Sequence, residues 1–143
     1  FFLFGLEDSS YRSIPLELIK KYQRLNVINL YINKKNILKY ISQADCSVLP
    51  TYYNEGLPKF LLESLASSNI ILTTKTPGCK MTLIENVNGF FVKKKSSYDL
   101  VKKFEKVLSL ERNQILRLKN NSYKFAKKFN ENTNINIYKS LLN

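Results

Sequence analysis

The sequence contains no histidine, and this absence removes several kinds of catalytic site. No imidazole is available among the 143 residues to act as the base for a serine or cysteine nucleophile. The usual nitrogen ligand of zinc is missing as well. We therefore expect neither a histidine-dependent nucleophile nor a bound metal ion, and we expect no cofactor.

Cysteine is scarce, and the two cysteines point to a reducing compartment. Cys46 and Cys79 lack the CxxC spacing of a metal or redox motif. Disulfide bonds are rare in cytosolic chains, so we favour two free thiols over a disulfide. We therefore expect a cytoplasmic protein, with the inner face of the membrane as the place of any lipid contact.

Long apolar runs are missing too. No stretch approaches about 18 consecutive apolar residues, and the sequence has no signal-peptide layout and no internal repeat. A hydrophobic content of 44% at this length still supports one domain with a core. Residues Phe1 to Gly5 lack a starting methionine and resemble a buried strand, so we expect a fragment that begins inside a fold.

Acidic residues are few, which leaves a large positive charge. The 11 Asp and Glu residues face 23 Lys and Arg residues, for a formal net charge of +12. Two interpretations stay open: a surface that meets anionic lipid headgroups or lipid-diphosphate acceptors, or solvated helix faces, which we favour. The lysines are not interleaved with a recognition element for nucleic acid, so no nucleic acid partner is expected. The lysine pairs and runs are Lys34-Lys35, Lys93-Lys94-Lys95, Lys102-Lys103 and Lys127-Lys128.

What the sequence does contain is a regular alternation of helices and strands. Near-continuous apolar strands that alternate with helices are typical of a parallel sheet with helices on both faces. We therefore predict a Rossmann-like α/β fold. The expected helices are 13–24, 37–44, 58–67 and a short one at 81–85, after a turn at 76–79, and the expected strands are 27–30, 46–49, 70–73 and 90–92.

From Ser97 onward the pattern is helical only. Three apolar stripes at helical spacing follow one another, within residues 100–108, 115–129 and 135–142. We interpret these stripes as packing faces. Residues 97–143 are thus expected to form the helical C-terminal part of the same domain.

The segment from Tyr53 to Ser67 combines a glycine turn, a proline helix start and two glutamates. Leu57-Pro58 opens an apolar helix directly after Gly56. Free backbone N–H groups at such a helix start attract phosphate. The crossover from strand to helix therefore predicts an anion subsite that needs no basic side chain.

The glutamates on either side of that subsite are too far apart to be one acid/base pair. Glu55 and Glu63 are eight positions apart, roughly 12 Å along a helix axis. Paired glycosidase carboxylates are separated by about 5 to 9.5 Å. We infer that the two carboxylates bind opposite ends of one ligand, and the order carboxylate, N–H groups, carboxylate matches the hexose, diphosphate and ribose of a sugar nucleotide.

Nearly the whole chain resembles the retaining, metal-independent GT-B glycosyltransferases of the group-one class, specifically their C-terminal, donor-binding domain. The resemblance rests on the E-x7-E motif from Glu55 to Glu63 and on its flanking segments. Those segments are Phe2-Leu3-Phe4-Gly5, Ile41 to Pro50, Pro77-Gly78-Cys79 and Asn88-Gly89-Phe90-Phe91-Val92.

The resemblance implies roles for individual residues. Glu55 is expected to face the donor hexose as the catalytic residue, and Glu63 to bind the ribose hydroxyls. Gly56, Leu57, Pro58 and Lys59 are expected to form the diphosphate turn, with N–H groups from all but the proline. The segment Leu30-Tyr31-Ile32 is expected beside the base, and Gly5, Thr51 and Gly78 in loops that line the site.

The resemblance also implies the activity: transfer of a hexosyl or N-acetylhexosaminyl group, with retention, from a UDP-sugar to a glycan or lipid-linked acceptor in polysaccharide biosynthesis. The N-terminal acceptor domain is absent from the 143 residues, so this fragment alone is expected to be inactive. Two alternatives stay open, an inactive truncated remnant and a nucleotide-sugar epimerase of the same architecture. A receiver-like module is disfavoured because its clustered acidic residues at strand ends are missing.

Overall fold

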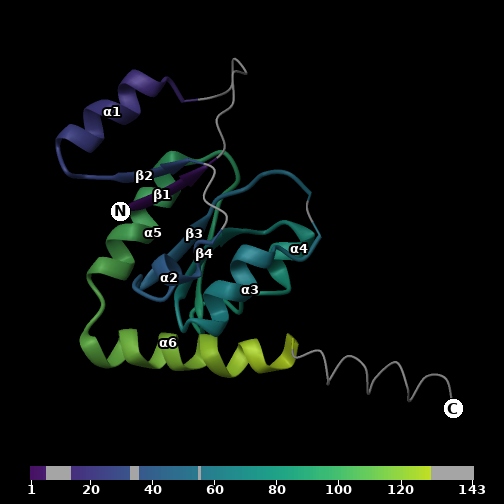
Figure 1. Cartoon of the computed structure of the whole chain (residues 1–143). Coiled ribbons are helices and arrows are strands. Elements are labelled where there is room, and N and C mark those ends of the chain that lie inside the picture. The colour runs from purple at the N-terminus through teal and green to yellow at the C-terminus, as the bar shows by residue number, and fades with distance from the viewer. Residues whose placement is uncertain (6–13, 33–35, 55, 130–143) are drawn as a thin grey trace, which may run out of the picture. The chain divides into compact units, whose positions relative to one another are not determined.

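The computed structural model describes residues 1–5, 14–32, 36–54 and 56–129 of the chain (Figure 1). The chain divides into two compact units. Residues 1–40 form the N-terminal unit and residues 41–143 form the C-terminal unit. In the described residues, no helix is both long and apolar enough to cross a membrane.

The N-terminal unit contains a parallel strand pair. Strand β1 (Phe2–Gly5) pairs with β2 (Asn29–Ile32), and helix α1 (Leu16–Arg24) connects them along the chain. Aromatic rings hold this unit together: Phe4 stacks on its register partner Tyr31 at 5.2 Å between ring centroids, and Tyr40 lies 4.5 Å from Tyr31. The short helix α2 (Leu38–Ile41) spans the boundary between the units.

The C-terminal unit contains a three-stranded parallel sheet in the order β3-β4-β5. These strands are β3 (Cys46–Leu49), β4 (Ile70–Thr74) and β5 (Gly89–Val92). The helices are α3 (Lys59–Ala66), α4 (Pro77–Lys80), α5 (Ser97–Leu108) and α6 (Arg112–Ala126), followed by the 3-10 turn η1 (Lys127–Phe129). The predicted parallel α/β fold is therefore confirmed.

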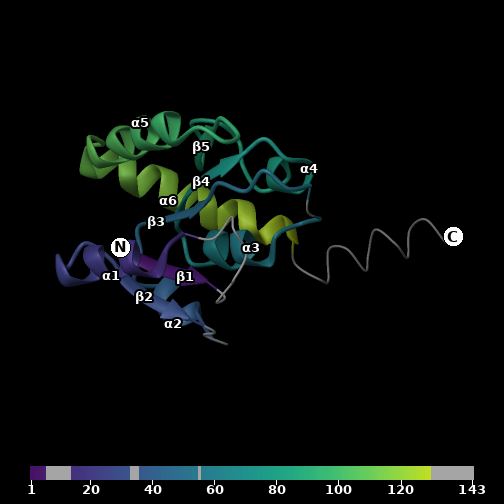
Figure 2. The same cartoon turned by 90° about the horizontal axis from the view of Figure 1, so that it is seen from above.

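Helices cover both faces of this sheet, because alternate strand residues point to opposite sides. Ile70 and Leu72 of β4 face a core that includes Val107 of α5. Ile71 faces a second core that includes Leu61 and Leu65 of α3. Figure 2 shows α5 on one side of β4 and α3 on the other. All five residues of β4 are buried, so this central strand belongs to both cores.

Helices α5 and α6 both carry capping residues at their starts. The Ser96 hydroxyl accepts a hydrogen bond from the amide of Asp99 at the start of α5, at 3.2 Å. Glu111 and Gln114 form a capping box at the start of α6. Helix α6 contributes Leu118 to the first core and Phe125 to the second, so it joins the two helical layers.

One expected helix is wrong. Residues 81–85 do not form the short helix, and a single helical turn lies instead at Pro77–Lys80, where a turn was expected. Proline suits the first position of a helix, which explains the earlier start. The Asn88 side chain accepts from the amide of Ile84 at 2.8 Å and donates to the carbonyl of Thr82 at 3.0 Å, so these backbone groups do not bond along a helix.

Other boundaries differ less. Helix 37–44 shrinks to Leu38–Ile41, and helix 13–24 begins at Leu16 with Pro15 at its N-cap. The stripes at 100–108 and 115–129 correspond to α5, α6 and η1. The third stripe, at 135–142, lies outside the described residues.

Gly89 is the position where the sheet most clearly requires a glycine. A Cβ atom there would overlap the backbone carbonyl of Ile71, its register partner on β4. We therefore expect Gly89→Ala to lower the free energy of unfolding by about 3 kcal/mol or more, because backbone atoms cannot move aside as a flexible side chain does. Urea denaturation followed by circular dichroism measures this loss.

Gly5→Ala is the matched control, because a Cβ atom at Gly5 meets nothing within 4 Å. Its free energy of unfolding should stay within about 1 kcal/mol of the wild-type value. Equal losses for the two variants would contradict the overlap at Ile71.

Candidate functional site

The candidate site lies where the chain crosses from β3 to α3. Strand β3 ends at Leu49, and α3 begins at Lys59 with Pro58 at its N-cap. Pro58 offers no side-chain hydrogen bond to the first helical turn. The first-turn amides of an α-helix have no partner within the helix, so those of Lys59 and Phe60 are available to an anion.

Glu63 lies one helical turn after Lys59, and the two side chains form an ion pair. The Lys59 Nζ atom is 3.5 Å from the Glu63 Oε1 atom. The lysine side chain is 88% exposed and the glutamate side chain 22%. The carboxylate is therefore partly enclosed, whereas its partner is free to swing into solvent. An exposed pair of this kind contributes little to stability, so a ligand can replace the lysine at small cost.

Two buried threonines of β4 fix the start of the loop that leads to α3. The Thr73 hydroxyl donates to the Leu49 carbonyl at 2.8 Å, and the Thr74 hydroxyl donates to the Thr51 carbonyl. Both threonines are fully buried. Thr73 thus holds the last residue of β3 and Thr74 holds the loop beyond it, and neither was among the predicted site residues. The signal that could have identified them is a pair of hydroxyl residues at the end of an otherwise aliphatic strand.

Two tyrosines follow Thr51 on this loop. The Tyr52 and Tyr53 rings are 4.4 Å apart between centroids, and their hydroxyls are 3.0 Å apart. The ammonium group of Lys95 lies 4.9 Å from the centre of the Tyr52 ring. The tyrosine pair thereby connects the β3–α3 loop with the segment that follows β5.

The structure describes most of the predicted donor residues but not all. Glu55 lies outside the described residues. Gly56 and Leu57 are exposed before α3, and Pro58 is buried beneath the start of the helix. Thr51 lies in the loop, and Gly78 is buried inside α4 rather than in an open loop.

The base-adjacent residues belong to the other unit. Leu30, Tyr31 and Ile32 form the end of β2, and Gly5 ends β1, its partner strand. The Tyr31 ring packs among aromatic side chains of its own unit. The place of these four residues in the donor site stays a prediction.

No group of three or more His, Cys, Asp or Glu side chains that could hold a metal ion occurs in the described ranges. The site chemistry in this part of the chain comes from amide groups, a carboxylate and lysines. That combination suits an anionic ligand with hydroxyl groups.

Cys46, at the start of β3, is an unreactive thiol. Burial of the thiol, and next the negative charge of Asp45, raise the pKa of Cys46 from 9.0 to about 12. The Asp45 carboxylate also forms an ion pair with Lys119 of α6 at 2.7 Å. Cys46 and Cys79 are both free thiols, as expected for two separate packing residues.

The sequence matches the family described as "Glycosyl transferases group 1" over residues 4–128. No curated protein matches the sequence.

Several solved structures share the fold. A glycosyltransferase from Rickettsia africae ESF-5 is similar with a TM-score of 0.77 and 20% identity, covering 99% of this chain and 40% of that one. Anabaena Alr3699/HepE in complex with UDP gives a TM-score of 0.80 and 16% identity, covering 98% of this chain and 40% of that one. The pneumococcal O-GlcNAc transferase GtfA in complex with UDP and GlcNAc gives 0.76 and 18%, covering 98% and 28%. The chain thus spans about 40% or less of these three structures.

Removal of the Thr74 hydroxyl should loosen the start of the loop. Thr74→Val keeps the shape of the side chain but takes a donor from the Thr51 carbonyl, so we expect the free energy of unfolding to fall by about 1 to 2 kcal/mol. Thr76→Val is a matched control, since the Thr76 hydroxyl is equally buried and has no hydrogen-bond partner among the described residues. It should be neutral or stabilising in the same urea titration. Equal losses in the two valine variants would rule out the anchoring role.

The raised pKa of Cys46 makes stability fall in alkaline solution. Below pH 9 the thiol is protonated in both the folded and the unfolded chain, and between pH 9 and about 12 only the unfolded chain releases the proton. We expect the free energy of unfolding to drop by up to about 1.4 kcal/mol per pH unit more steeply in the wild type than in Cys46→Ala. Urea titrations at about pH 8, 9 and 10 measure the two slopes, and parallel slopes would contradict the shift.

Proposed function

The chain belongs to the group 1 glycosyl transferases, and from this premise we propose that it is the donor-binding half of a retaining glycosyltransferase. The observation that carries the proposal is the start of α3, where uncapped amides precede Glu63 by one helical turn. In a nucleotide sugar the diphosphate is bonded directly to the ribose, so the two groups can occupy neighbouring positions one helical turn apart. The site therefore matches the donor rather than the acceptor.

In the proposed complex the amides of Gly56, Leu57 and Lys59 donate to the diphosphate. The positive end of the α3 dipole adds to this attraction. Glu63 accepts hydrogen bonds from the ribose hydroxyls, while Lys59 leaves its ion pair and turns to the phosphate. Glu55 faces the hexose as the catalytic residue, and the end of β2 lies beside the base.

The chemical task of this half is to stabilise the departing diphosphate. As the glycosidic bond breaks, negative charge develops on the phosphate oxygens, and fixed amide donors stabilise that charge without reorganising. We propose a front-face route with retention, in which the leaving phosphate assists the attacking hydroxyl. Thr73 and Thr74 serve this step indirectly, because they fix the loop that presents the amides.

We propose UDP as the nucleotide and a hexose or N-acetylhexosamine as the sugar. The support is that two proteins of similar fold were solved with UDP, one of them also with GlcNAc. In this proposal the base is contacted by residues Leu30 to Ile32 of the N-terminal unit.

We propose that the acceptor is a glycan or a lipid-linked saccharide of polysaccharide biosynthesis. Residues outside this chain are proposed to bind it. The basis is that the chain spans about 40% of two of the solved structures that share its fold. We propose a cytoplasmic protein that works at the inner face of the membrane, and no sugar transfer by the 143 residues alone.

Isothermal titration calorimetry with UDP tests the donor site. The wild-type chain should bind UDP, and Glu63→Ala should weaken the affinity about tenfold or more, because a charge-assisted hydrogen bond to the ribose is lost. Glu105→Ala is the matched control, since Glu105 is an exposed carboxylate on α5. It should change the affinity less than about twofold.

The outcomes separate the alternatives. Equal affinity of wild type and Glu63→Ala would remove the donor assignment. If UDP binds and the full-length protein forms an epimerised donor instead of a glycoside, the chain is an epimerase. If UDP binds and no product of either kind appears, the protein is an inactive remnant.

A further inference from the structure

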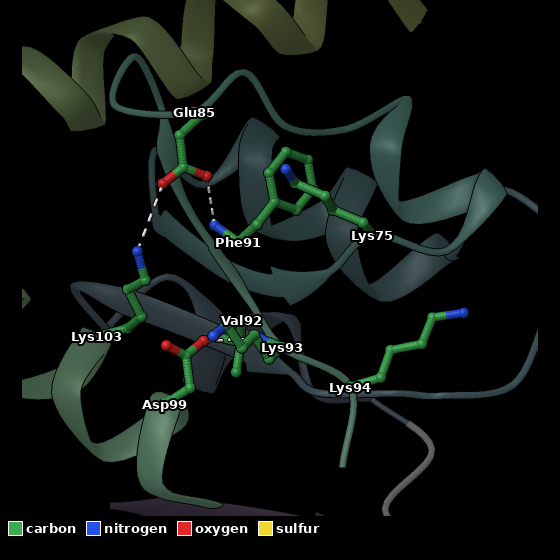
Figure 3. A pocket seen from close by; sticks show the side chains of 8 residues that line it. All are labelled: Lys75, Glu85, Phe91, Val92, Lys93, Lys94, Asp99 and Lys103. Atoms are coloured by element: carbon green, nitrogen blue, oxygen red, sulfur yellow. Dashed lines mark hydrogen bonds and ion pairs between the residues drawn. The ribbon is translucent and has the colours of Figure 1, made fainter. Parts of the chain in front are cut away.

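A pocket lies in the C-terminal unit, at the edge of the sheet away from β3. It has a volume of about 370 Å³ and opens between the end of β4, the end of β5 and the first turns of α5 (Figure 3). Parallel strands lie about 4.8 Å apart, so β5 is separated from β3 by roughly 10 Å. The lining residues are Lys75, Glu85, Phe91, Val92, Lys93, Lys94, Asp99 and Lys103, and none of them comes from β3, from the loop after it or from α3.

The two carboxylates of this pocket are already used by the backbone. Strand β5 is an edge strand, and its outward amides need partners. Glu85 accepts a hydrogen bond from the Phe91 amide, and Asp99 accepts one from the Lys93 amide, each at 2.7 Å. Figure 3 shows both carboxylates turned toward the strand. They satisfy two outward amides at the edge of the sheet.

The positive charges of the pocket lysines are only partly balanced by ion pairs with carboxylates. Lys103 forms an ion pair with Glu85 at 3.6 Å. In the described part of the chain, Lys75 and Lys94 take part in no ion pair. The ammonium group of Lys75 lies over the Phe91 ring at 5.3 Å, and Figure 3 shows Lys94 extended outward, away from the other labelled side chains. The first turn of α5, at the positive end of its dipole, contributes Asp99 to the lining.

We propose that this pocket binds a phosphate ester. Four lysines and a helix start form a field for a multiply charged anion, and lysine ammonium groups bind phosphate as point charges. Phe91 and Val92 offer apolar surface to the organic part of the ester. The volume lies in the range of small-ligand pockets. The phosphate ester is either a soluble molecule, such as a sugar phosphate or a polyol phosphate, or the headgroup of a phospholipid.

The probe for a soluble ester is glycerol 3-phosphate, added to the ¹⁵N-labelled 143-residue chain at low ionic strength. Amide resonances of Phe91, Lys93 and Lys94 should shift, while those of Lys59 and Phe60 at the start of α3 should not. This readout separates the pocket from the donor site, so a failed UDP titration does not decide it. Neutral glycerol should cause no shift.

The decisive variant is Lys75→Gln combined with Lys94→Gln, which should weaken glycerol 3-phosphate binding about tenfold. The matched control combines Lys80→Gln with Lys124→Gln, which removes the same charge from two exposed lysines outside the pocket. It should change the affinity less than about twofold, because distant exposed charges are screened. UDP affinity should stay unchanged in both double variants.

Flotation with phosphatidylcholine vesicles, with and without phosphatidic acid, tests the lipid source. If the wild type binds only vesicles that contain phosphatidic acid, and only the pocket variant loses this binding, the ester belongs to a lipid. If the amides shift with glycerol 3-phosphate and vesicles do not bind, the ester is soluble. Absence of both responses in the wild type, or equal losses in the pocket variant and the control, overturns the proposal.

Discussion

The burial of β4 on both faces is the constraint on which the C-terminal unit depends. All five residues of this strand are inaccessible, and its backbone pairs with β3 on one edge and with β5 on the other. A strand in this position requires helices on both sides, because its alternate side chains face opposite ways. Helices α3 and α5 meet this requirement, and α6 contributes apolar residues to both cores.

The same constraint places the candidate donor site. Parallel strands end on one side of the sheet, so the loops after β3, β4 and β5 all start there. Thr73 bonds to the last residue of β3, and Thr74 extends the contact of β4 to Thr51 in the loop that leads to α3. The amides at the start of α3 are therefore positioned by a buried strand rather than by the loop itself. Rigid placement of this kind is what electrostatic stabilisation of a leaving group needs.

The scarcity of acidic residues leaves the protein with an excess of positive charge. Several of the few carboxylates have structural partners: Asp45 pairs with Lys119, Glu85 and Asp99 accept from amides of the edge strand, and Glu63 pairs with Lys59. Lysines outnumber the acids available to balance them. Many of these lysines lie over aromatic rings, as Lys75 and Lys106 do over Phe91 and Phe90. The lysine ammonium groups are thus stabilised by aromatic rings as well as by water.

The sequence by itself determined the α/β class, the alternation of helices with parallel strands and the helix start at Pro58. These follow from local patterns, namely apolar strand runs, helical spacing and proline at a helix start. It did not determine the segment 81–88, where Asn88 bonds to backbone groups of Thr82 and Ile84 and displaces the expected helix. Nor did it identify Thr73, Thr74 or the pocket at β5. The threonine contacts and the pocket join residues that are far apart in the chain. Only the packing of β4 between its neighbouring strands brings these residues together.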